Sequence, residues 1–166
     1  MTAAMVAAVA ATLGIVVGRF WDVRSESARW RRDQMVTSYQ RLAEAYRRTV
    51  EGIRTVALAD PADPALPGLV AQVRSDSEWD DGYVAVLLHG SPEVAEAALA
   101  MDVAVTELFY EAQDRRHGVE DWYRIRIPAG RAQEGFIDAV RAELDLKPIP
   151  VKYRAVARQV PAPASE

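Results

Sequence analysis

The stretch MVTSYQRLAEAYRRTVEGIRTVAL, residues 35–58, decides the fold. Its large apolar side chains recur every three or four residues, which places them along one face of a helix. This seam consists of Met35, Tyr39, Leu42, Tyr46, Val50, Ile53 and Ala57. Because such seams are buried between helices in bundles and coiled coils, the stretch predicts a long helix that packs against other helices.

A second seam lies in residues 91–114. Ser91 suits the N-cap of a helix and Pro92 its first turn, and Gly118 suits the stop that follows it. The apolar side chains again recur every three or four positions: Val94, Ala98, Met101, Val105, Leu108 and Ala112. Both predicted helices contain 24 residues, which corresponds to about 36 Å at the rise of an α-helix. Equal lengths favour antiparallel neighbours in one bundle.

The rest of the chain adds weaker elements. A short helix is predicted to begin at Leu69, after a proline-rich loop, and a last helix is predicted over residues 129–146, after Pro128. Trp122 is expected to pack from the segment before that helix. Residues 83–88 are apolar and rich in β-branched side chains, so the pattern leaves strand and helix open there. The fold class expected from these elements is all-α.

The first 18 residues contain no charged side chain. A helix of this length is about 27 Å long, close to the thickness of the hydrocarbon core of a bilayer. We therefore predict a single-pass transmembrane anchor over residues 1–18, with a cleaved signal peptide and a buried or interfacial helix as alternatives. Residues suited to the membrane interface follow directly: Arg19, Phe20, Trp21, Arg24, Arg29, Arg31 and Arg32.

Three further segments follow the anchor in this prediction. Residues 19–34 form a basic juxtamembrane helical stalk, because polar side chains interrupt its seam. Residues 35–150 form a small helical bundle, and residues 151–166 form a tail that is largely disordered at its end. Since the arginines follow the anchor, the positive-inside rule predicts the N-terminus outside the cell membrane and the body in the cytoplasm.

No catalytic, cofactor-binding or metal-binding residue is predicted. The chain contains two histidines and no cysteine, and no phosphate-binding loop or nucleophile motif occurs. The acidic cluster Asp76, Glu78, Asp80 and Asp81 is the best metal candidate. It fails as a calcium loop because Asp81 replaces the required glycine and Leu87 the bidentate glutamate.

Three segments resemble a group of actinobacterial uncharacterised proteins that have an N-terminal membrane helix and a small helical domain. These segments are WRR at 30–32 leading to YQRL at 39–42, VLLHGSPEV at 86–94, and FIDAVRAEL at 136–144. The resemblance implies a helical fold and a bacterial origin. It implies no activity.

The expected function is contact with another protein at the membrane, as an adaptor or accessory subunit. The lipid bilayer and a protein are the expected partners, with homo-oligomerisation through the stalk as a further expectation. A net charge of −4 and a pI near 5.3 argue against a nucleic-acid partner. A membrane-tethered enzyme with an unrecognised site and a lipid-surface sensor are the alternatives.

Overall fold

The computed structural model describes residues 2–75 and 77–149, with side chains at Glu26 and from Arg29 onward. This part of the chain forms helices and no strand, so the all-α prediction is confirmed. The helices are α1 (Thr2–Leu58), α2 (Leu66–Arg74), α3 (Ser77–His89), α4 (Pro92–Asp114), α5 (Val119–Ile125) and α6 (Ile127–Glu143).

The chain divides into two compact units, residues 1–37 and residues 38–166. The first unit consists of the N-terminal part of α1, and the described part of the second, residues 38–149, is called the bundle below. Among the residues described, no helix is long and apolar enough to cross a membrane. The predicted anchor, residues 1–18, lies outside the residues whose side chains are described, and it stays a prediction.

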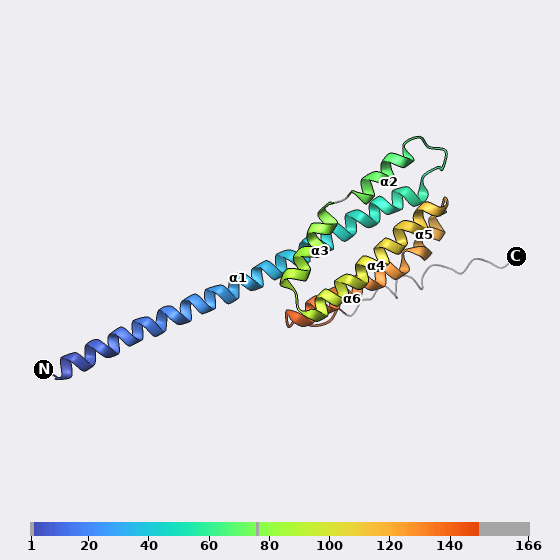
Figure 1. Ribbon diagram of the computed structural model, residues 1–166. Helices are drawn as coiled ribbons and strands as arrows, with labels where there is room; N and C mark the ends of the chain where they lie inside the picture. Colours follow the sequence, from blue (N-terminus) through green and yellow to red (C-terminus); the bar gives the residue numbers. More distant parts are fainter. Residues whose placement is uncertain (1, 76, 150–166) are drawn as a thin grey trace. The chain divides into compact units, whose positions relative to one another are not determined.

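Within the bundle, α1 and α4 run in the same direction, so the prediction of antiparallel neighbours is wrong. At one end, Glu143 accepts hydrogen bonds from the Tyr39 hydroxyl and from the Ser91 backbone N–H. At the other end, the backbone N–H of His117 donates to the carbonyl of Ala57 at 2.8 Å. Helices α2 and α3 together make the return path between the end of α1 and the start of α4 (Figure 1).

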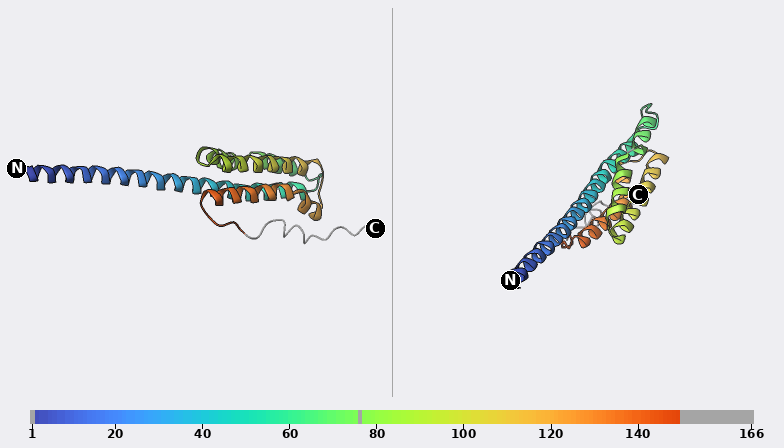
Figure 2. Two further views of the ribbon diagram at one scale, coloured as in Figure 1. Left: turned by 90° about the horizontal axis from the view of Figure 1, so that it is seen from below. Right: turned by 60° about the vertical axis from the view of Figure 1, so that its left-hand side comes forward.

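Both predicted seams form the core of the bundle. In α4, all six seam residues are buried, and Ser91 caps the helix by accepting a hydrogen bond from the backbone N–H of Val94 at 3.3 Å. In α1, the seam residues Tyr39, Leu42, Tyr46, Ile53 and Ala57 are buried. The fourth side of the bundle is α6, which packs along α4 (Figure 2).

The elements that the sequence pattern left open are helical. Residues 83–88 belong to α3, and Trp122 is buried from a short helix, α5, that the pattern did not predict. The last helix is shifted from the predicted 129–146, because Pro128 occupies its first turn instead of preceding it. It ends where Asp145 adopts a left-handed φ of 57°, the backbone conformation that commonly terminates helices.

Gly82 lets α3 approach the backbone of α1. A Cβ atom at this position would lie 3.2 Å from the Cα atom of Leu42 and 3.3 Å from its backbone nitrogen. Backbone atoms cannot rotate out of the way as a side chain can, so the contact requires glycine. Gly135 in α6 is the opposite case, because a Cβ there meets nothing within 4 Å.

Gly82→Ala should destabilise the protein by about 1–3 kcal/mol, because the gain in helix propensity is smaller than the cost of overpacking. Gly135→Ala, the matched control, should stabilise it by about 0.5–1 kcal/mol through helix propensity alone. Denaturant unfolding of the full chain in a mild detergent measures both. Equal effects of the same sign would contradict the close approach.

Candidate protein-docking surface

The residues predicted for the membrane interface are described only in part. Arg29, Arg31 and Arg32 are exposed, as is Trp30 with 64% of its surface accessible. Arg19, Phe20, Trp21 and Arg24 lie outside the residues whose side chains are described. Exposure is compatible with a role at a lipid surface and does not test it.

Both histidines have structural partners. His89 shares a 2.8 Å hydrogen bond with the hydroxyl of Ser38, which links α3 to α1. His117 is buried, and its Nε2 atom lies 3.0 Å from the carbonyl oxygen of Glu111. Because a carbonyl only accepts, this nitrogen carries the proton of the ring. The ring of His89 therefore joins α3 to α1, and the ring of His117 holds the loop after α4 against the end of that helix.

Three clefts of the bundle contain ionisable side chains. One of about 510 Å³ between α1 and α2 is lined by one carboxylate, Glu78, which is paired with Arg48. A second, of about 410 Å³, is lined by apolar side chains together with Gln113, Asp114, Arg115 and Arg116, and Arg116 lies 3.7 Å from Asp60. A third, of about 200 Å³, has Arg74, Asp80 and Asp102 in its lining, and Asp102 accepts a hydrogen bond from Trp79. In the described part of the chain no group of histidines or carboxylates is suited to hold a metal ion.

Tyr39 is the one described group with a clear pKa shift. Its ring packs edge-on against Phe136 at 6.3 Å between centroids, and only 4% of its surface is accessible. Burial, followed by the hydrogen bond to Glu143 and the charge of that residue, raises the pKa of the Tyr39 hydroxyl well above its usual 10. The folded state therefore favours the neutral phenol.

This shift predicts a loss of stability at high pH. Above about pH 10 the unfolded chain releases the Tyr39 proton while the folded chain retains it, so the free energy of unfolding falls as pH rises. The stabilisation is complete below pH 10. Wild type should lose up to about 1.4 kcal/mol per pH unit more than Tyr39→Phe between pH 10 and 11. Identical pH dependence of urea unfolding in the two proteins would refute the prediction.

The outward side of α4 carries a second apolar stripe. Leu99, Val103 and Tyr110 expose 50%, 48% and 60% of their surfaces. At 3.6 residues per turn they lie within about 40° of one another and opposite the buried seam. They are called the α4 outer stripe below. Isolated exposed apolar residues are ordinary, but an aligned set marks a contact surface.

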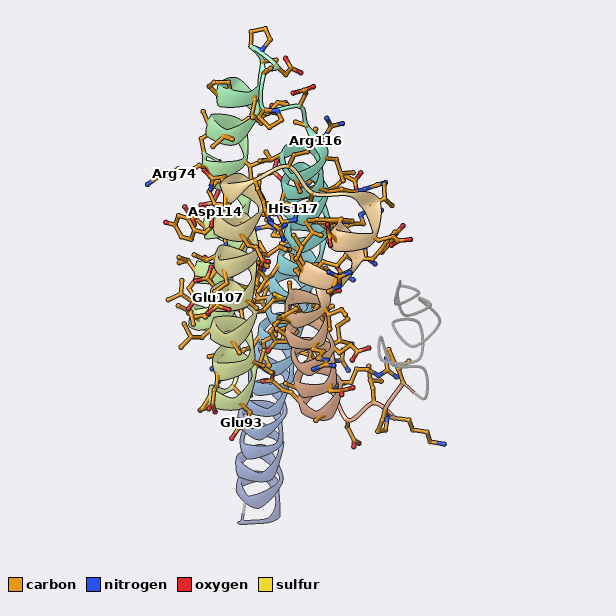
Figure 3. All side chains as sticks on the ribbon, turned by 90° about the vertical axis from the view of Figure 1, so that its right-hand side faces the viewer. Arg74, Glu93, Glu107, Asp114, Arg116 and His117 are labelled. Atoms are coloured by element: carbon orange, nitrogen blue, oxygen red, sulfur yellow. The ribbon has the colours of Figure 1, made fainter. Side chains whose placement is uncertain are left out.

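Most of the acidic residues of α4 lie along one side of this stripe. The α4 helix contains six acidic residues and neither lysine nor arginine, and Figure 3 shows Glu93, Glu107 and Asp114 spaced along it. The cations near its C-terminal end, Arg74 and Arg116, belong to α2 and to the loop after α4. An apolar stripe on a helix with six acidic residues and no basic residue of its own suits a partner that is both apolar and basic.

The neighbouring helix α3 also exposes apolar side chains. Val84, Leu87 and Leu88 are exposed, the last with 74% of its surface accessible. The indole N–H of Trp79 donates to Asp102 at 2.8 Å, which holds α3 against α4. Residues 77–114 together contain nine acidic residues and no lysine or arginine.

The sequence analysis missed this surface although its signal is present in the sequence. Leu99, Val103 and Tyr110 are four and seven residues apart, a helical spacing that coexists with the buried seam. The absence of cations from residues 77–114 is visible as well. Which of the two seams of α4 faces the core depends on packing, so the outer stripe became recognisable only in the folded bundle.

No protein-family model matches this chain, and no curated protein or solved structure is significantly similar to it. The resemblance to actinobacterial membrane proteins therefore stays a prediction. Any functional argument rests on the bundle and its surface.

Proposed function

We propose that this protein is a single-pass, membrane-anchored adaptor that binds another protein through the outer surfaces of α3 and α4. The observation that carries the proposal is the α4 outer stripe, an aligned set of half-exposed apolar side chains on a helix that contains six acidic residues and neither lysine nor arginine. The core of the bundle does not need these side chains, because a separate seam of α4 fills it.

The charge of the bundle narrows the class of partner. Residues 38–149 contain twenty acidic and twelve basic side chains, a formal charge of −8. Anionic lipid and nucleic acid are repelled by such a surface, and so is a second copy that approaches through the same surface. A protein segment with exposed apolar and basic side chains fits both the stripe and its charge.

The anchor is supported by the sequence of residues 1–18 and by the basic residues after it. In this proposal the N-terminus lies outside the cell membrane and the bundle in the cytoplasm. A protease added to intact spheroplasts should then leave the bundle uncut. Cleavage of the bundle under these conditions would show that the bundle lies outside the cell membrane.

Membrane extraction tests the anchor. The full chain should stay in the membrane pellet after carbonate washing, whereas the double variant Val9→Arg, Val16→Arg should be released. Each arginine near the bilayer centre costs about 2.5–3.5 kcal/mol of insertion free energy. Ser25→Arg adds a charge outside the anchor and should behave as wild type. Release of the full wild-type chain would end the transmembrane proposal.

Native gel electrophoresis of detergent-solubilised membranes tests the docking surface. The wild-type protein should migrate as a complex that is larger than a single chain in a detergent micelle. The double variant Leu99→Ser, Val103→Ser should lose that complex by about tenfold or more, since central apolar contacts carry most of the binding energy. Arg131→Ser, an exposed change on α6, is the control. A complex unaffected by the double variant would contradict the assignment.

A further inference from the structure

We infer that the C-terminal segment of this chain, residues 151–160, docks on the outer surfaces of α3 and α4 and competes there with the protein partner. The inference rests on the proposed function, because it uses the same docking surface, and it adds a way in which binding of the partner is regulated. The segment, VKYRAVARQV, lies outside the described residues, so the argument uses its sequence and the point from which it departs.

The charges of the C-terminal segment and of the surface of α3 and α4 are complementary. Lys152, Arg154 and Arg158 give the segment three cations, and no acidic residue occurs in it. Residues 77–114 contain nine acidic residues and no lysine or arginine, and one of the nine, Glu78, is paired with Arg48 of α1. Opposite charges of this kind favour encounter and fix orientation, and the attraction falls as salt is added.

The apolar side chains are complementary as well. In the segment, the cations are interleaved with Val151, Tyr153, Val156 and Val160. On the bundle, the α4 outer stripe and the exposed leucines of α3 have no apolar cover. The segment thus combines the basic and the apolar side chains that the surface favours. Residues 122–131 share this composition, but they are folded into α5 and α6.

The departure point of the segment puts the surface within reach. Ser91, at the start of α4, donates its backbone N–H to Glu143, at the end of α6, at 3.1 Å. Beyond α6 the chain is held by Arg141, whose Nε donates to the carbonyl of Lys147 at 2.8 Å. The nine residues after Lys147, up to Val156, extend up to about 30 Å. Val103 lies about 18 Å along α4 from Ser91.

Because the segment belongs to the same chain, weak contacts are sufficient to hold it on the docking surface. A short tether gives the segment an effective concentration in the millimolar range at the surface. A foreign partner must then displace it, so the segment sets a threshold for partner binding. Chains that end at Pro150 should therefore form more of the partner complex than the full chain does.

Cysteine cross-linking in the full chain tests the inference, and the natural sequence has no cysteine to interfere. Val103→Cys and Val156→Cys are introduced together, and a bismaleimide joins them. The matched control pairs Val156→Cys with Gly135→Cys, an exposed position on α6. We expect about tenfold more intramolecular product for the Val103 pair, because the tethered segment favours the acidic surface.

Charge reversal distinguishes docking from random collision. Changing Lys152, Arg154 and Arg158 to glutamate should reduce the product to the level of the control pair. Adding Glu96→Lys and Glu107→Lys to that variant should restore much of it. In 1 M salt the unmodified pair should lose most of its product, since the screening length falls to about 3 Å.

Three results would overturn the inference. They are equal product at Gly135, product insensitive to charge reversal, and product formed only between two chains carrying one cysteine each. None of these results affects the proposed function, which the complex lost in Leu99→Ser, Val103→Ser tests separately. Loss of that complex without a specific cross-link leaves the docking surface standing and removes the segment from it.

Discussion

Leu108→Ala should lower the free energy of unfolding by about 2–5 kcal/mol, because it removes buried methyl groups and leaves a cavity. Leu108 lies in the buried seam of α4, with 3% of its surface accessible. At one end of the bundle the Glu143 carboxylate of α6 accepts from the start of α4, and at the other end the loop after α4 donates to the carbonyl of Ala57 in α1. Collapse around the cavity is therefore restricted. Denaturant titration followed by circular dichroism gives the change.

Leu99→Ala is the matched control, since it makes the same change on the outer side of the same helix. Leu99 is half exposed, so its truncation should change the free energy of unfolding by about 0.5 kcal/mol or less. Helix propensity contributes equally to both variants and cancels in the comparison. Equal losses would show that the two seams of α4 are not divided between core and surface.

Glu143→Ala should cost about 2–3 kcal/mol, because two donors lose a charged acceptor in one change. The Tyr39 hydroxyl and the Ser91 backbone N–H both donate to this carboxylate, so it joins α6 to α1 and to the start of α4. Glu107→Ala, an exposed change on α4, should have little effect.

A double-mutant cycle measures the part of that loss that belongs to the hydrogen bond from Tyr39. In a Tyr39→Phe background, Glu143→Ala should cost about 1 kcal/mol less than in wild type, because the phenol is no longer left without its acceptor. Additive losses would show that the hydrogen bond between the two side chains contributes nothing to stability.

The periodicity of the sequence was sufficient for the two principal helices. The seam from Val94 to Ala112 is the buried set of α4, and Leu42, Ile53, Val105 and Leu108 are buried as expected. These positions were predictable because each buried seam keeps a regular spacing along one helix. The same rule made residues 83–88 ambiguous, since a short apolar run has no period to measure.

The direction and packing of the helices relative to one another were not predictable from the spacing of residues along one helix. Lengths alone suggested that residues 35–58 and 91–114 are antiparallel, yet His117 and Ala57 meet at the ends of parallel helices. The return path through α2 and α3 depends on close approaches such as that of Gly82 to Leu42, which no local pattern encodes. The docking surface depends on the same packing, because only the bundle determines which side of α4 remains uncovered.

Site-specific photo-cross-linking at Val103 in native membranes tests the central claim most directly. A photoreactive amino acid replaces Val103 in the full chain, with Gly135 on α6 as the matched exposed position. We predict that illumination yields one discrete adduct with a different protein at Val103, absent at Gly135 and weakened by Glu96→Lys with Glu107→Lys. No adduct above the Gly135 level, or an adduct only with a second copy of this chain, would contradict the account.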